Sequence, residues 1–406
     1  MKIIVINQPT KNRGDESAHR SLIRTMIKKL PSVSITVLFY GIDVNTIEQM
    51  KIANDNVKYL TIPTHRGCAK LFKLSILFKF DGLLAIFHPF IRKYISILKQ
   101  GNLILNAPGG ICMGLYQNWE HIYWLRRAKN LKKPLAYYSR SFGPFPVNSR
   151  KSRVFKKKSV ELLKYFCFLS IRDSETMKIA EELKLNFVPS IDTAFLDVPE
   201  VEIPDDIKKI LGKNYMVFVP NSLTWQPQYK KVDQDLIDCI YLAIIDLLHS
   251  RFPENNIVML PQLFNRQERG DFIYFGKLKN KSNCHNLIVL SDQYGSDIQQ
   301  SIIAKSHLVI GARYHSIVFA INNNVPFVAL SYEHKINGLL NILNKTDSLV
   351  DLSLIGNDKF DANVFMKLVK NAIQKATVNI ENNKEAASIA AKCFDEFRMF
   401  INKYSS

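Results

Sequence analysis

A short segment in the second half of the chain holds the residues best suited to anion binding and proton transfer. Gly311-Ala-Arg-Tyr-His-Ser follows the apolar run 308–310, which is typical of a buried strand. Arg313 can hold a phosphate or carboxylate with two parallel hydrogen bonds, and His315 can exchange a proton near neutral pH. A lone histidine is more often structural, but Arg-x-His at the carboxyl end of a strand is better placed than most. The next apolar run carries three more polar residues to the same expected edge, namely Tyr332, Glu333 and Lys335.

The first segment of this kind lies near the start of the chain. Asn12-Arg-Gly-Asp leads from the first expected strand into the first expected helix. Gly14 permits a tight turn, Asp15 is a suitable N-cap, and the first amides of a helix attract anions. The spacing fits neither a dinucleotide fingerprint nor a phosphate-binding P-loop. An ordinary strand-to-helix turn with a capping aspartate is an equally good interpretation of this segment alone.

Two other segments follow expected strands in the first half. Gly109 and Gly110 permit close approach of a ligand or of another backbone, although paired glycines are also common in turns. Arg172 stands where a strand meets the next helix, so its guanidinium could face a cleft. Asp173 beside it is expected to cap that helix, with Thr176 three residues further on. An Arg-Asp pair is more often structural than catalytic.

Strand-like and helix-like segments alternate along the whole chain, which predicts parallel sheets covered by helices. We expect an α/β protein of two doubly wound, Rossmann-like domains that face a cleft, with ligands at the carboxyl ends of the strands. The expected domains are 1–205 and 206–378, followed by a C-terminal helix over 379–406. The expected strands are 3–7, 35–40, 57–62, 103–106, 135–139, 168–171, 216–219, 257–260, 287–290, 308–310 and 327–330, and a long apolar-striped helix is expected at 233–252.

The composition is that of an ordinary globular protein, and its 406 residues exceed the size of one hydrophobic core. The net charge of +19 is compatible with nucleic acid, an anionic membrane or acidic substrates, but no nucleic-acid-binding signature is present. The six cysteines are scattered without metal-ligand spacing, so we expect reduced thiols, no metal and a cytoplasmic location. No signal peptide or membrane-spanning stretch is expected. The segment 71–99 mixes lysines and arginines with large apolar residues and predicts contact with a membrane surface.

The order of these segments resembles that of the polysaccharide pyruvyl transferase family from about Asn7 to Leu340. The segments that carry the resemblance are Asn12-Arg-Gly-Asp, Gly109-Gly, Ser141-Phe-Gly-Pro, Ile171-Arg-Asp, Ser190-Ile-Asp-Thr-Ala-Phe, Leu260-Pro-Gln, Gly311-Ala-Arg-Tyr-His and Val325-Pro-Phe-Val-Ala-Leu-Ser-Tyr with Lys335. One departure is Tyr314, since a small aliphatic residue commonly stands between the arginine and the histidine. A second departure is the charge of the first loop, which carries Lys11 and Arg13. Both departures leave the acceptor specificity open.

The resemblance implies a GT-B-like arrangement of two domains, with the acceptor on the first and phosphoenolpyruvate on the second. It also implies transfer of pyruvate from phosphoenolpyruvate to two hydroxyls of a sugar, as a ketal, with no cofactor. His315 is then the expected acid–base, and Arg172 and Arg313 hold phosphate and carboxylate. Either Asp15 or Asp192 would orient acceptor hydroxyls. Further substrate-binding residues are expected at Asn12, Gly109, Gly110, Tyr314 and Lys335.

Two other functions stay open. A GT-B glycosyltransferase would use a nucleotide sugar, whose diphosphate also needs arginines at a helix N-terminus. A non-catalytic scaffold at the inner face of the membrane would depend on the segment 71–99 and not on Arg313 or His315. For the transferase, the acceptor sugar could itself be lipid-linked.

Overall fold

The computed structural model contains two compact α/β units. It describes residues 1–64, 68–226, 229, 231–264, 270–332, 334–357, 360–376 and 380–404. Unit 1 comprises residues 1–10, 18–196 and 388–406, and unit 2 comprises residues 11–17 and 197–387. The division between Leu196 and Asp197 lies shortly before the expected boundary at 205/206. The last helix is divided between the two units, at Ala387/Ser388.

Unit 1 is built on a seven-stranded parallel sheet with the order β3-β2-β1-β4-β5-β6-β7. This order is that of the classic dinucleotide-binding sheet, extended by one strand. Its elements are β1 (Lys2–Ile6), α1 (Arg13–Lys29), β2 (Ser34–Tyr40), α2 (Val44–Met50), β3 (Val57–Ile62), α3 (Cys68–Leu77), α4 (Asp81–Phe87), α5 (Pro89–Gln100), β4 (Leu103–Asn106), α6 (Trp119–Asn130), β5 (Leu135–Tyr137), α7 (Arg150–Leu163), β6 (Phe168–Ile171), α8 (Ser174–Glu182) and β7 (Val188–Pro189).

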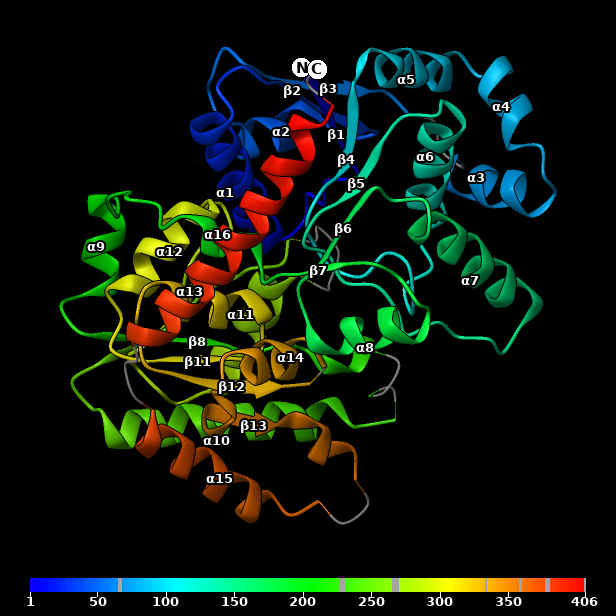
Figure 1. Cartoon of the computed structure of the whole chain (residues 1–406). Coiled ribbons are helices and arrows are strands. Elements are labelled where there is room, and N and C mark those ends of the chain that lie inside the picture. Colours follow the sequence, from blue (N-terminus) through cyan, green and yellow to red (C-terminus); the bar gives the residue numbers. More distant parts are fainter. Residues whose placement is uncertain are drawn as a thin grey trace. The chain divides into compact units, whose positions relative to one another are not determined.

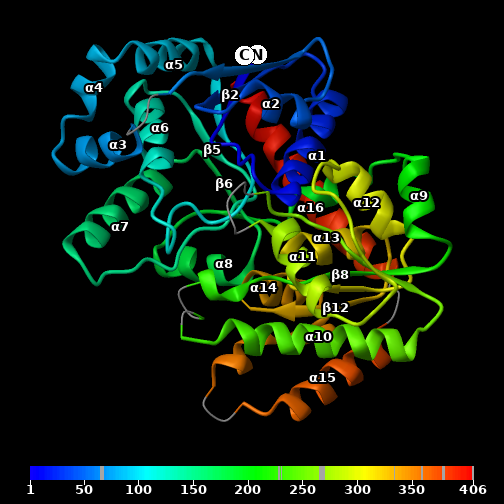
Figure 2. The same cartoon turned by 180° about the vertical axis from the view of Figure 1, so that it is seen from behind.

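Alternate residues of the central strand of unit 1 serve two separate cores, as the two-residue period of a strand requires. Ile4 and Ile6 belong to the core formed with α3, α5, α6 and α7. Ile3 and Val5 belong to the core formed with α1, α2 and the C-terminal part of α16 (Ile380–Asn402), including Phe394. Figures 1 and 2 show these two groups of helices on opposite faces of the sheet. The sheet is therefore buried on both faces, as parallel sheets are.

Unit 2 repeats the same strand order in a six-stranded parallel sheet, β10-β9-β8-β11-β12-β13. Helices α10 and α15 pack together on one face, and α12 and α13 pack together on the other (Figures 1 and 2). The elements are α9 (Asp205–Leu211), β8 (Tyr215–Val219), α10 (Gln234–Arg251), β9 (Asn256–Met259), α11 (Asp271–Lys281), β10 (Leu287–Val289), α12 (Ser296–Ala304), β11 (Val309–Gly311), α13 (Tyr314–Asn322), β12 (Phe327–Ser331), α14 (His334–Ile342), β13 (Leu349–Asp351) and α15 (Ala362–Lys375).

The expected α/β class with two Rossmann-like parts is confirmed, and the expected strands lie within one or two residues of the observed ones. The short strands β7 and β13 were not expected. The prediction that Asp15 caps the first helix is wrong. Helix α1 begins at Arg13, and Oδ1 of Asn12 accepts a hydrogen bond from the amide of Gly14 at 2.7 Å. The expected cap at Asp173 is confirmed, because its Oδ1 accepts from the amide of Thr176 at 2.8 Å.

Candidate active site

His315 lies in the first turn of α13, directly after the central strand β11 of unit 2. The strand order reverses between β8 and β11, and ligands of such sheets bind outside the carboxyl ends at this reversal. The imidazole is 5% exposed and meets the ring of Tyr314 edge-on, with the centroids 5.0 Å apart. The histidine is therefore held in one position at the expected edge of the sheet.

The segment 11–17 belongs to unit 2, although it follows the first strand of unit 1. Its backbone pairs with the loop after β9. The amide of Arg13 donates to the carbonyl of Gln262 at 2.9 Å, and the amide of Phe264 donates to the carbonyl of Lys11 at 3.0 Å. These bonds attach the start of α1 to the carboxyl edge of the second sheet.

Gly14 lies directly against His315. A Cβ atom added at Gly14 would be 1.8 Å from Nδ1 and 1.9 Å from Cγ of the histidine. Only a residue without a side chain fits beside an imidazole at this distance. The segment Asn12-Arg-Gly-Asp therefore meets the histidine of Gly311-Ala-Arg-Tyr-His-Ser within one unit.

Arg13 is a buried cation that the sequence did not single out as a site residue. Its Nη1 pairs with Glu16 at 2.6 Å, its Nη2 donates to the carbonyl of Asp292 at 2.8 Å, and its guanidinium lies 3.8 Å from the ring centroid of Phe264. Glu16 in turn accepts from the amide of Ser296 at 2.9 Å. Arg13 thus anchors the segment 11–17 to the loops after β9 and β10, with its charge balanced by Glu16.

Arg313 forms a two-pronged ion pair with Asp271, and both side chains are buried. Oδ2 of Asp271 also accepts from the amides of Gln262 and Leu263, at 3.0 and 2.9 Å. Burial alone would lower the pKa of Arg313, but the Asp271 charge outweighs it and the pKa is raised. Arg313 is therefore a permanent, fixed cation, and its expected contact with substrate stays a prediction.

A buried side-chain amide with an unpaired N–H donor lies at the same edge of the sheet. Gln262 is 1% exposed, and among the described residues its Nε2 has no hydrogen-bond partner. Lys335 lies in the first turn of α14, after β12, and is half-buried. Glu333 lies outside the described residues. An anion bound near His315 could therefore interact with positive charge, with backbone amides and with the unpaired side-chain donor of Gln262.

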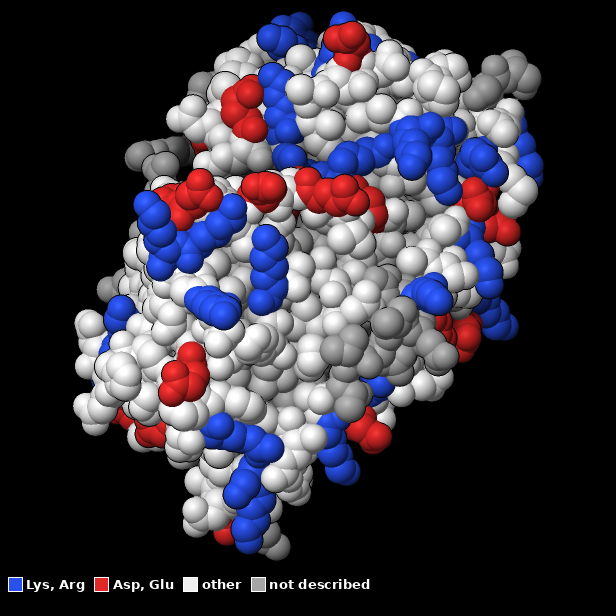
Figure 3. Space-filling view, turned by 90° about the vertical axis from the view of Figure 1, so that its left-hand side faces the viewer, with Lys and Arg blue, Asp and Glu red and all other residues white. Residues whose placement is uncertain are grey.

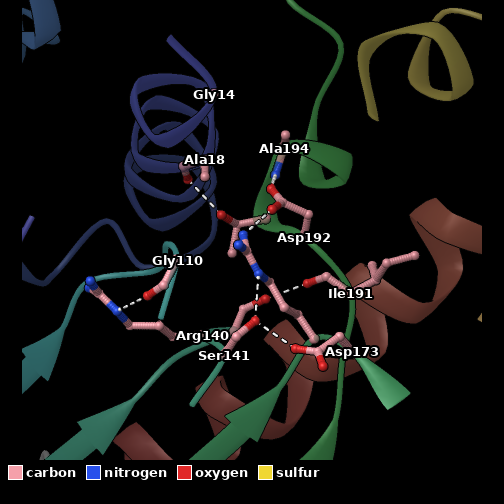
Figure 4. A network of polar contacts seen from close by, with 12 residues as sticks. Gly14, Ala18, Gly110, Arg140, Ser141, Asp173, Ile191, Asp192 and Ala194 are labelled. Atoms are coloured by element: carbon pink, nitrogen blue, oxygen red, sulfur yellow. Dashed lines mark hydrogen bonds and ion pairs between the residues drawn. The ribbon is translucent and has the colours of Figure 1, made fainter. Parts of the chain in front are cut away.

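In unit 1, Arg172 and Asp192 form a buried ion pair (Figure 4). Asp192 is fully buried, and its Oδ1 accepts from the amide of Ala194 at 2.9 Å. Ser141 lies between Arg172 and the capping carboxylate of Asp173, donating to Asp173 at 2.5 Å. The pair fixes the loops after β5, β6 and β7. The expected substrate contacts of Arg172 and Asp192 stay predictions.

Arg140 holds the turn that follows β4, which contains the glycine pair. Its Nε donates to the carbonyl of Gly110 at 2.9 Å (Figure 4). Its Nη1 donates to the carbonyls of Asn7 and Ala107 at 3.0 and 2.9 Å. Gly109 has a φ of 144°, which other residues rarely adopt. The glycine pair therefore permits a tight turn that Arg140 stabilises. The structure shows no ligand contact for either glycine.

The predicted site residues fall into two groups, one in each unit. Unit 2 contains Asn12, Asp15, Arg313, Tyr314, His315 and Lys335, and unit 1 contains Gly109, Gly110, Arg172 and Asp192. No cluster of three or more metal-ligating side chains occurs among the described residues, and the expectation that no metal is needed stays a prediction.

Comparison with solved structures identifies the class of fold. The chain is similar to UDP-GlcNAc 2-epimerase from Neisseria meningitidis bound to UDP-GlcNAc (TM-score 0.57, 10% identity, 98% of this chain and 100% of that chain). It is also similar to UGT2 of Phytolacca americana in complex with UDP-2-fluoro-glucose and pterostilbene (TM-score 0.54, 9% identity, all of both chains). These similarities establish the GT-B fold and leave the reaction open.

The sequence identifies the family. Residues 12–334 match the family described as polysaccharide pyruvyl transferase, and the chain belongs to that family. It is thus a transferase of polysaccharide biosynthesis. It is also 22% identical to the amylovoran biosynthesis protein AmsJ of Erwinia amylovora, over all of this chain and 98% of that protein. The expected family is confirmed.

Proposed function

We propose that the chain transfers pyruvate from phosphoenolpyruvate to two hydroxyls of a sugar in a polysaccharide or its precursor. The observation that carries the proposal is the contact of Gly14 with His315 beside the Arg313–Asp271 pair, in a chain of this family. A compact, highly charged anion needs fixed cations and donors, which Arg313, Lys335 and Nε2 of Gln262 would supply. AmsJ, named for amylovoran biosynthesis, supports a polysaccharide acceptor.

In the proposed reaction, one sugar hydroxyl adds to C2 of phosphoenolpyruvate while C3 gains a proton and becomes a methyl group. The second hydroxyl then displaces phosphate from C2, which closes the ketal. One hydroxyl proton ends on the methyl group and the other leaves with phosphate, so the reaction needs no oxidant or cofactor. His315 would give the proton to C3 and recover one from a hydroxyl. Arg313 would stabilise charge that develops on the phosphate.

Replacing His315 by glutamine should nearly abolish ketal formation, because general acid–base catalysis contributes roughly 10²–10⁴-fold. The test uses a producing strain in which the variant replaces the chain, and proton NMR of its polysaccharide reports the ketal methyl group. His307→Gln is the matched control, since His307 is an exposed histidine of the same unit. Near-normal ketal content in the His315→Gln strain would remove His315 from the mechanism.

Exposed apolar side chains on α3, α4 and the turn between them support contact with a membrane surface. Phe78 and Phe87 are 71% and 76% exposed, and Ile86 is 58% exposed. Exposed basic residues flank them at Lys70, Lys79, Arg92, Lys93 and Lys99. In the view of Figure 3, by contrast, basic and acidic side chains are interspersed over the surface. Among the described helices, none is long and apolar enough to cross a membrane.

We therefore propose that α3 and α4 rest on an anionic bilayer at the cytoplasmic face, where a lipid-linked acceptor would be found. The chain should sediment with vesicles that contain phosphatidylglycerol, and Phe78→Ser/Phe87→Ser should largely remove this binding. The control Val364→Ser/Leu368→Ser changes two exposed apolar residues of unit 2. Equal sedimentation of both double variants would contradict the membrane contact.

A further inference from the structure

A cavity of about 220 Å³ opens in unit 1 at the carboxyl ends of β1 and β2. The strand order of this sheet reverses between β1 and β4, so the cavity occupies the usual ligand position of the fold. All of its lining belongs to unit 1, whereas His315 belongs to unit 2. The residues that line it and carry the argument are Asn7, Tyr40, Tyr94, Glu120, His121 and Trp124.

One wall of the cavity is aromatic. Trp124 stacks on Tyr94 with the centroids 3.8 Å apart, and Tyr40 lies 4.9 Å from Trp124. Trp124 also contacts Phe72 and Tyr123, so this wall is a rigid part of the core. Such a surface accepts the apolar C–H face of a ring while excluding water from that side.

The polar part of the lining, called the polar wall below, carries groups that the fold does not fully pair. His121 is 3% exposed, and its Nε2 has no hydrogen-bond partner among the described residues. Burial, and then the charge of Arg140, lower the pKa of His121 well below its ordinary value, so the imidazole is neutral at pH 7. A buried polar atom left unpaired costs stability, and its place on a cavity wall indicates a ligand that pairs with it.

Glu120 lies beside His121 in the first turn of α6. Burial raises the pKa of Glu120 above its ordinary value, and the neighbouring indole of Trp124 acts in the opposite direction. Asn7 completes the polar wall; its Nδ2 donates to Asn106 at 2.9 Å. The wall therefore offers a carboxyl group, a neutral imidazole and an amide, which together accept and donate hydrogen bonds at short intervals.

We propose that this cavity binds one sugar ring of the acceptor, with Glu120 and His121 hydrogen-bonding its hydroxyls. A pyranose has hydroxyls around its rim and apolar faces, which matches a lining that contains both polar and aromatic side chains. Cavities of roughly 300–1,000 Å³ hold drug-sized ligands, so this smaller one suits a single ring. The assignment rests on the proposed pyruvyl transfer. It adds the location of the acceptor sugar and the residues that select it.

The test compares Glu120→Gln with wild type in the binding of methyl glycosides of glucose, galactose and mannose, followed by saturation-transfer NMR. At least one glycoside should bind wild type, and Glu120→Gln should weaken it about ten- to a hundredfold, the usual range for a hydrogen bond to a charged group. His121→Phe should weaken the same glycoside. The matched control is Glu175→Gln, which changes the first turn of α8, outside the cavity.

The stability of Glu120→Gln separates binding from folding. The raised pKa means that the folded state favours the protonated carboxyl, so ionised Glu120 destabilises the fold as pH rises above the ordinary value of 4.5. Glu120→Gln should therefore melt no lower than wild type at pH 7, with the difference closing below pH 4.5. Equal glycoside affinity in wild type and variant, or binding of no glycoside at tens of millimolar, would overturn the assignment. If either result were obtained while the protein still bound phosphoenolpyruvate normally, only the cavity assignment would be overturned and the proposed function would stand.

Discussion

Replacing Gly14 by alanine should reduce pyruvyl transfer roughly 10²–10⁴-fold, as much as removal of the acid–base group itself. The new methyl group would lie 1.8 Å from Nδ1 of His315, so the histidine or the start of α1 must move. His315 is buried and has little room to adjust. Forcing extra atoms into a packed site costs about 1–3 kcal/mol, so the variant should still fold. Ketal formation by the purified variant, together with its melting temperature, measures both effects.

Gly276→Ala provides the control for this change. Gly276 lies within α11 of the same unit, and a Cβ there would meet no atom within 4 Å. Alanine favours a helix over glycine by about 1 kcal/mol, so this variant should be slightly more stable and fully active. If Gly14→Ala retained wild-type turnover, the close contact with His315 would have no part in the reaction.

Asp271→Asn should destabilise unit 2 by about 3–5 kcal/mol, because it leaves the buried guanidinium of Arg313 without a compensating charge. Both partners are almost fully buried, at 8% and 2% side-chain exposure. The Asp271 carboxylate also holds the amides of Gln262 and Leu263 at the base of the site. Urea unfolding followed by far-UV circular dichroism measures the loss, and phosphoenolpyruvate binding should fall with it.

Two further variants define the origin of that loss. Asp235→Asn removes an exposed carboxylate that pairs with Lys281, and it should change stability by no more than about 0.5 kcal/mol. The double variant Asp271→Asn/Arg313→Met should recover part of the stability, since neither charge then lacks its partner. A double variant no more stable than Asp271→Asn would show that the pair is not coupled.

The alternation of apolar and polar segments was enough to predict both sheets and the residues at their carboxyl ends. Arg313, His315 and Lys335 were found because a strand end can be recognised from local pattern. The partner of Arg313 could not be found in this way. Asp271 lies 42 residues earlier in the chain, and only the packed sheet brings it to the loop after β11.

The assignment of residues 11–17 to unit 2 was also beyond the sequence. The segment follows β1 directly, so its position in the chain suggested the first domain. Its backbone hydrogen bonds to the loop after β9 instead place it in unit 2. The partners in these bonds are some 250 positions away in the chain. The N-cap of α1 was predicted wrongly because Asn12 and Asp15 are both good N-cap residues. Local residue preference alone did not distinguish between them.

Glu120 and His121 were missed because they lie inside a helix pattern with strong apolar character. Their neighbours Trp119, Ile122 and Trp124 are apolar and buried, a pattern typical of a core helix. Nothing in the spacing distinguishes a histidine that lines a cavity from one that fills a core. The cavity itself depends on how α5 and α6 pack on β2, which is a property of the folded unit.

Calorimetric titration of phosphoenolpyruvate into the purified protein, beside UDP-glucose and UDP-N-acetylglucosamine, tests the proposed reaction most directly. Lys335→Ala should weaken phosphoenolpyruvate about ten- to a hundredfold, and Lys305→Ala, which removes an exposed lysine of the same unit, should not. We predict saturable binding of phosphoenolpyruvate and none of the nucleotide sugars. Binding of a nucleotide sugar without phosphoenolpyruvate would contradict pyruvyl transfer and indicate a glycosyltransferase, and binding of neither would favour a non-catalytic scaffold.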